Sequence, residues 1–292
     1  MLVPDQVRKC VVFVGYKNAK NEYELAGTGF FVSRPSRDPV GGYGFSYLVT
    51  ARHVIDGIRS TGADSVALRV NNKSGRAQWV EIPLGNWLFH PTDATVDVAL
   101  MRCSIPDEGD HVASPLAMFV SEQTIEGVQI GVGDEVFLSG LFAFHHGEQR
   151  NIPIIRIGNI AAMPEEPVRT GLGPIDAYLV EARSIGGLSG SPVYVHVPMA
   201  RTWNARPEFA GKDGSVFYLL GLMHGHWDVP ISDSRDELSE DGFQTQRVNV
   251  GIAIVVPASK ILEVISQPMI REDEDRRDEE DRKQNPAPTD GS

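Results

Sequence analysis

Three things are scarce in this chain: cysteine, long apolar runs and an excess of positive charge. Only Cys10 and Cys103 are present among 292 residues, which is too few and too isolated for a disulfide framework. Cys103 follows an apolar run, so we expect a buried small hydrophobic residue there rather than a reactive thiol. The net charge of −12 argues against nonspecific binding to nucleic acid or to anionic membranes, because both require a basic surface.

Signals for export or membrane insertion are also missing. No stretch approaches the roughly 20 apolar residues that a membrane-spanning helix needs. The first 14 residues carry Asp5, Arg8 and Lys9, and no small-residue cleavage site follows their short apolar run. We therefore expect a cytoplasmic protein, although a chain trimmed of its signal would look the same.

What the chain does contain is many short strand-like segments. They are rich in Val, Ile, Phe and Tyr and are separated by Gly, Pro, Asn and Asp, which is typical of β-strands. In the first half we expect strands near 11–15, 27–32, 45–50, 65–71, 77–83 and 96–103. In the second half we expect them near 134–141, 152–161, 177–182, 191–197, 216–224 and 248–256. A strand-poor connector at 104–131 separates the two sets, so the pattern predicts an all-β protein.

The C-terminal part changes character. Pro257 and Ser259 are helix-start signals, and the apolar residues Ile261, Leu262 and Ile265 recur at helical spacing. Residues 271–283 then contain eight acidic and five basic residues and no apolar one. Such composition predicts a disordered, solvated tail over 269–292.

Three segments at strand edges contain residues suited to nucleophilic catalysis. The first runs from Tyr47 through Leu-Val-Thr-Ala-Arg to His53, and the second places Asp97 at the start of an apolar strand. The third is the glycine-rich stretch Gly186-Gly187-Leu-Ser189-Gly-Ser-Pro. Each segment alone is better explained as a half-buried histidine, a turn acid or a hairpin loop. Their joint occurrence, in the order His, Asp, Ser, favours catalysis.

The chemistry explains why these three residue types are needed together. A serine hydroxyl is a poor nucleophile until an adjacent imidazole removes its proton. The imidazole needs a buried carboxylate on its other nitrogen, which fixes the tautomer and stabilises the imidazolium. The developing oxyanion needs preorganised N–H donors, and the backbone of Gly187 and Ser189 could aim two at one point. Glycine at 187 permits the backbone geometry that this requires.

At this level of detail the chain resembles a known family. The pieces that carry the resemblance are Gly27-Thr-Gly-Phe-Phe-Val, Thr50-Ala-Arg-His53-Val, Asp97-Val-Ala-Leu and Gly187-Leu-Ser189-Gly-Ser-Pro-Val. They are similar to chymotrypsin-like (trypsin-like) serine peptidases, most of all to the bacterial branch that includes HtrA-type proteases and glutamyl endopeptidases. The similarity covers roughly residues 10–267.

The resemblance implies a fold and a set of roles. The fold is two six-stranded antiparallel β-barrels with a C-terminal helix. One catalytic domain would then span 1–268, with barrels at about 10–104 and 132–257 and a helix at about 258–267. His53 would be the general base, Asp97 its orienting acid and Ser189 the nucleophile. The N–H groups of Gly187 and Ser189 would form the oxyanion hole.

The sequence also offers two alternative site assignments. Ser191 is a rival nucleophile, but it stands where the family loop usually has its second glycine, so we favour Ser189. His145 with His146, or His224 with His226 and Asp228, could be read as metal ligands. A metal site usually needs three or four converging ligands, so we expect no metal and no cofactor.

Substrate choice is predicted only from the resemblance. The segments expected to wall the specificity pocket are similar to those of glutamyl endopeptidases, which implies an acidic residue before the scissile bond. An aliphatic preference remains open, since Leu222 and Met223 lie in the same stretch. The residues that this reading assigns to substrate binding are Arg183, Ser184, His224, His226 and Gly251.

The function expected from these observations is a serine endopeptidase acting on a protein or peptide substrate. A regulatory protein partner is conceivable, and nucleic acid and membrane are not expected as partners. The alternative from another class is a catalytically silent protease-fold module that binds peptides. An esterase is disfavoured because the Gly-x-Ser-x-Gly elbow and the order Ser-Asp-His are absent.

Overall fold

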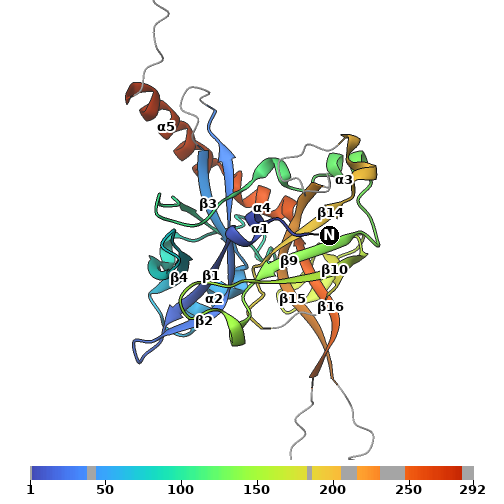
Figure 1. Cartoon of the computed structure of the whole chain (residues 1–292), viewed down its shortest axis with the longest axis horizontal. Helices are drawn as coiled ribbons and strands as arrows, with labels where there is room; N and C mark the ends of the chain where they lie inside the picture. Colours follow the sequence, from blue (N-terminus) through green and yellow to red (C-terminus); the bar gives the residue numbers. More distant parts are fainter. Residues whose placement is uncertain (1, 38–43, 183–185, 205–215, 231–246, 285–292) are drawn as a thin grey trace, which may run out of the picture.

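Two β units joined along one side make up the body of the molecule (Figure 1). The computed structural model describes residues 2–37, 44–182, 186–204, 216–230 and 247–284. The first unit comes from the N-terminal half and the second from the C-terminal half, with short helices around them. The all-β prediction is confirmed.

The first unit is an eight-stranded sheet. Its strands are β1 (Val11–Lys17), β2 (Tyr23–Pro35), β3 (Gly44–Thr50), β4 (Ser65–Asn71), β5 (Ala77–Pro83), β6 (Leu88–Phe89), β7 (Ala99–Cys103) and β8 (Ser114–Pro115). They are ordered β5-β4-β1-β2-β3-β7-β6, and β8 pairs in parallel with β2. The resemblance implied a closed barrel of six strands here. Instead, two short strands are added, and no ladder between the edge strands β5 and β6 is formed among the described residues.

The second unit is a closed six-stranded barrel, as the resemblance implied. Its order is β10-β13-β16-β15-β14-β9. The strands are β9 (Glu135–Gly140), β10 (Ile154–Ala162), β13 (Tyr178–Glu181), β14 (Pro192–Val197), β15 (Val216–Pro230) and β16 (Arg247–Pro257). A small hairpin of β11 (Val168–Thr170) and β12 (Gly173–Ile175) lies outside the barrel ladder.

A shared apolar core joins the two units. Phe137, Tyr194 and Phe217 from the second barrel belong to the same buried cluster as the strands of the first sheet. The ring of Phe137 stacks on that of Tyr194 at 5.4 Å between centroids and meets Phe217 edge-on at 5.1 Å. The Tyr194 hydroxyl is hydrogen-bonded to Ser114, at 2.7 Å. These contacts hold the two units together, and a site built from both therefore keeps its geometry.

Helices fill the edges of this β framework. They are α1 (Asp5–Lys9), α2 (Arg52–Ser60), α3 (Glu122–Val128), α4 (Ala258–Ile265) and α5 (Pro268–Gln284). In the described part of the chain, short 3-10 turns occur at η1 (Leu84–Asn86), η2 (Leu116–Met118), η3 (Ala143–His145) and η4 (Met199–Asn204). The helix expected near 258–267 is α4. None of the described helices has the length and apolar character to cross a membrane.

The tail expected to be disordered from residue 269 is helical up to Gln284, so that expectation was wrong for this stretch. Helix α5 contains no large apolar face, but two of its acidic side chains are buried against the first sheet. Glu274 pairs with Arg34 at 2.7 Å and accepts a hydrogen bond from the Tyr47 hydroxyl, and Asp278 accepts one from Ser36 at 2.7 Å. Polar partners on β2 and β3 therefore order the helix. Residues 285–292 lie outside the described residues.

Candidate active site

His53 lies in the first turn of α2, which follows the end of β3 directly along the chain. Strand β3 ends at Thr50, Ala51 is the extended N-cap residue, and His53 is the second residue of the helix. The sequence suggested that the strand runs straight into the histidine. Val54, Ile55 and Ile58 are buried instead at helical spacing, so α2 packs one apolar face on the sheet.

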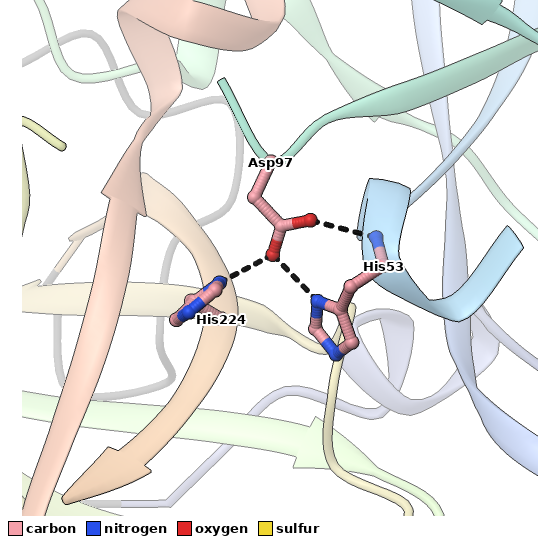
Figure 2. Close-up of side chains that lie close together, drawn as sticks. All are labelled: His53, Asp97 and His224. Carbon is pink, nitrogen blue, oxygen red and sulfur yellow. Dashed lines mark hydrogen bonds and ion pairs between the residues drawn. The ribbon is translucent and has the colours of Figure 1, made fainter. Parts of the chain in front are cut away.

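Asp97 holds His53 by two separate contacts. Its Oδ1 accepts a hydrogen bond from the backbone N–H of His53 at 2.8 Å, and its Oδ2 lies 2.7 Å from Nδ1 of the same residue (Figure 2). Ala51 offers no side-chain cap, so the carboxylate satisfies one of the free N–H groups of α2. A negative charge is also favourable at a helix N-terminus.

The position of Asp97 explains why β7 begins later than expected. Val98 N–H donates to Val96 O at 2.9 Å, which makes a tight turn around Asp97, and the strand starts at Ala99. Asp97 is fully buried, with 0% exposure. Burial alone would raise the pKa of this carboxyl, but hydrogen bonds from His224 and His53 outweigh it and hold the pKa below its usual range.

The loop that carries Ser189 is shaped by two glycines in left-handed conformations. Gly187 has φ +97° and Gly190 has φ +82°, a region that side chains disfavour. A Cβ on Gly190 would also lie 2.2 Å from Thr28 O and 2.4 Å from Thr50 Oγ1. Only glycine at 190 therefore lets the loop rest against the end of β3 at Thr50, three residues before His53.

Thr28 on β2 connects this loop to the first sheet, and it is a site residue that was not expected from the sequence. Its N–H donates to Ser189 O at 2.9 Å, and its hydroxyl donates to Gly187 O at 2.8 Å. The same hydroxyl accepts the N–H of Leu141 at 2.9 Å. Thr28 is fully buried, so these bonds are shielded from water. The sequence feature that could have identified Thr28 is its position between two glycines, in Gly27-Thr-Gly.

The backbone N–H groups of Gly187 and Ser189 have no hydrogen-bond acceptor within the described parts of the chain. The next N–H groups are satisfied: Gly190 donates to Met223 O at 2.8 Å, and Ser191 donates to Leu188 O at 2.9 Å. The N–H of Leu188 between them also has no acceptor among the described residues, and the two donors on either side of it are the pair that the sequence assigned to an oxyanion hole. Uncommitted donors are what a developing oxyanion requires.

The Ser189 hydroxyl is directed to the backbone of β15. It donates to His224 O at 3.3 Å, and among the described residues no hydrogen bond joins it to His53. Ser189 itself is half-buried. A hydroxyl aligned in this way is compatible with a nucleophile, because catalytic hydrogen bonds are often long or poorly aligned before substrate binds.

Ser191, the rival nucleophile, is packed away from this opening. It is 0% exposed, and its Oγ is buried without a hydrogen-bond partner among the described residues. A Cβ built on Gly140 would come within 2.0 Å of that Oγ, which places the hydroxyl against strand β9. An acyl group of a substrate has no room there.

The residues assigned to substrate binding have different environments. His224 Nδ1 lies 2.5 Å from Oδ2 of Asp97, so this histidine joins the His53–Asp97 pair, which the sequence did not suggest. His226 is half-buried on β15, opposite Ala253. Gly251 has φ +82°, and its carbonyl accepts the N–H of Ala182 at 2.9 Å. Arg183 and Ser184 lie outside the described residues.

His53, Asp97 and His224 are also the one group of three potential metal ligands found in the described part of the chain. Their nearest atoms are in direct contact, at 2.7 and 2.5 Å from Oδ2. Ligands about 2.0–2.1 Å from a tetrahedral metal would stand roughly 3.3 Å apart. These residues could hold a metal only after separating, and as they stand they form a hydrogen-bonded cluster. His145 and His146 belong to no such group.

Comparison with known proteins adds information about the fold. No family model matches the chain, and no curated protein matches it. The apo protease domain of MamO from Magnetospirillum magneticum is similar, with a TM-score of 0.50 and 15% identity over 90% of this chain and 98% of that domain. Protease A of Thermobifida fusca matches at a TM-score of 0.35 and 14% identity, covering 85% of this chain and 91% of that one. The likeness to the MamO domain shows that this chain has a chymotrypsin-like protease fold.

Proposed function

We propose that the protein is a serine endopeptidase in which His53 is the general base, Asp97 its orienting acid and Ser189 the nucleophile. The observation that carries the proposal is the double contact between Asp97 and His53. A carboxylate can only accept, so Nδ1 of His53 must bear the proton of this bond. The neutral ring then has its lone pair on Nε2, the atom that must take a proton from serine.

The reaction would proceed in two steps, acylation of Ser189 and hydrolysis of the acyl-enzyme. The Ser189 hydroxyl leaves its bond to His224 O and gives its proton to Nε2 of His53, while Oγ attacks the peptide carbonyl. The oxyanion is held by the N–H groups of Gly187 and Ser189. His53 then returns the proton to the leaving amine, which yields an acyl-enzyme. Water, deprotonated by His53, releases the acid and restores Ser189.

A fluorophosphonate probe, which labels activated serines, tests the assignment. We expect the wild-type protein to be labelled and Ser189→Ala to remain unlabelled, as judged by intact-mass spectrometry. Ser191→Ala is the matched control and should label as the wild type does, because that hydroxyl is buried. Labelling that persists in Ser189→Ala and disappears in Ser191→Ala would show that the wrong serine was chosen.

One observation favours the alternative, a silent peptide-binding module. The Ser189 hydroxyl is bonded to a backbone carbonyl and not to His53. If that arrangement persists with substrate bound, serine is never activated. A module of this kind would bind peptides without cutting them and would stay unlabelled by the probe under every condition.

An acidic side chain before the scissile bond remains our proposal for the substrate. A desolvated carboxylate would need charge-assisted donors in the pocket. His224 can supply one only through Nε2, because Nδ1 faces Asp97. Matched peptides with Glu, Leu, Ala or Lys at this position test the preference. Cleavage after Leu or Lys that is as fast as cleavage after Glu, or faster, would contradict the acidic preference.

A further inference from the structure

His224 leaves the regular strand pairing at a β-bulge. Met223 pairs with Val255 and Gly225 with Ile254, so His224 is the extra residue between two consecutive partners. A bulge bends the strand and re-aims the side chain of the inserted residue. Here the imidazole turns toward Asp97, which lies between the two histidine rings (Figure 2).

The contact with His224 completes the coordination of a buried carboxylate. Oδ2 of Asp97 accepts the Nδ1 proton of His53 at 2.7 Å and that of His224 at 2.5 Å, while Oδ1 accepts the backbone N–H of His53. A carboxylate with no exposure needs such donors to stay ionised. His224 is itself only 14% exposed at the side chain, so water competes little for this bond.

The backbone around His224 also contacts the nucleophile loop. The carbonyl of His224 accepts the Ser189 hydroxyl at 3.3 Å. Met223, the residue before it, forms two backbone hydrogen bonds with the same loop. Its carbonyl accepts the N–H of Gly190 and its N–H donates to the carbonyl of Ser191, each at 2.8 Å. His224 therefore contacts Asp97 through its side chain and Ser189 through its backbone carbonyl.

We propose that His224 is a positioning residue of the active site, which fixes Asp97 and through it His53. The sequence placed it instead in the wall of the specificity pocket. The catalytic consequence of this inference rests on the proposed peptidase function. Without the Nδ1 donor of His224, the Asp97 carboxylate is held by His53 alone, so no independent group fixes the direction in which Oδ2 presents itself to the His53 ring. A misplacement of about 1 Å can cost about 10²-fold in rate.

Three substitutions separate hydrogen bonding from packing. In His224→Asn, the side-chain N–H₂ occupies the place of Nδ1 and can still donate to Asp97. In His224→Gln the amide is one carbon further out, and in His224→Leu the donor is gone. With a peptide substrate that has Ala before the scissile bond, so that no substrate carboxylate depends on His224, we expect kcat to fall about 10²-fold in the Leu and Gln variants. KM should stay within about twofold, and the Asn variant should be close to wild type. A rise in KM with unchanged kcat in all three variants would overturn the proposal and return His224 to substrate binding.

A second readout does not depend on activity. Protein labelled with 15N in the imidazole rings should show two downfield Nδ1–H resonances in proton NMR, one from His53 and one from His224. We expect the His53 resonance to persist in His224→Asn and to move or exchange away in His224→Leu. An unchanged His53 resonance in His224→Leu would overturn the positioning role. If the His53 resonance changes as expected but the wild-type protein cleaves no peptide, the peptidase function is contradicted and the positioning role is supported.

Discussion

At the scale of single residues, the candidate site is organised around two buried polar side chains, Asp97 and Thr28, whose hydrogen-bond partners lie on other segments of the chain. Asp97 is the most important of them because it is fully buried and joins His53, His224 and the start of α2. From the sequence, the contact between His53 and Asp97 could be expected, because the His, Asp and Ser segments occur together in the order of the family that the chain resembles. Their catalytic roles stay predictions. The contact with His224 could not be predicted, since it depends on a one-residue bulge that no sequence pattern marks.

Protonation of Asp97 should affect stability in acid. Its pKa is lowered in the folded state, so the unfolded chain binds this proton more readily. The stabilisation from Asp97 is therefore fully present above the unfolded pKa of about 4 and is lost as the pH falls below it. We expect the gap in free energy of unfolding between wild type and Asp97→Asn, measured with urea, to shrink between pH 5 and pH 3. A constant gap would mean that the pKa of Asp97 is not lowered.

Both thiols should react slowly in the folded protein. Burial raises the pKa of the fully buried Cys10 to about 11. Cys103 is partly exposed, contrary to the expectation from the sequence, but desolvation still raises its pKa to about 12, and only the thiolate is a good nucleophile. At pH 8 we expect labelling by a disulfide reagent to be about a hundredfold slower, or more, in native protein than in urea. Rapid native labelling of Cys103 would contradict its raised pKa.

At the scale of secondary structure, strands were easier to predict than helices. Each of the twelve expected strands overlaps one in the structure, because short β-branched runs between turn residues give a clear signal. Helix α2 was missed because the apolar run of β3 continues into it and Gly57 interrupts the helical pattern. Helix α5 was missed because its stability comes from distant polar partners, Arg34 on β2 and Tyr47 on β3, which composition does not reveal.

Strand β2 should control the nucleophile loop through Thr28. Replacing Thr28 by Val keeps the shape but leaves Gly187 O and Leu141 N–H without their buried partner. Each unsatisfied group costs about 1–3 kcal/mol, and the displaced loop should lower kcat by about 10²-fold. Thr28→Ser keeps the hydroxyl and is the control. Parallel unfolding and kinetic measurements check this, and equal activity of the Val and Ser variants would show that the bonds do not position the loop.

At the scale of the whole molecule, α5 anchors the C-terminal region to the first sheet. The side chains of Arg34 and Glu274 are 9% and 4% exposed, so their ion pair is nearly dry. Glu274→Ala would leave the Arg34 charge uncompensated and should cost about 3–5 kcal/mol. Glu279→Ala, on the exposed side of the same helix, should stay within about 0.5 kcal/mol of wild type. Similar losses in both variants would mean that helix propensity, and not the buried pair, determines the effect.

Two β units meeting over one shared core bring the three catalytic candidates together from three distant segments of the chain. The central claim is that His53 and Ser189 act as one unit. The most direct test is kcat/KM for peptide hydrolysis in His53→Ala, Ser189→Ala and the double variant. Each single change should lower the value by several orders of magnitude, and the double variant should be no worse than either one. Losses that multiply, or single variants that cleave as the wild type does, would contradict the claim.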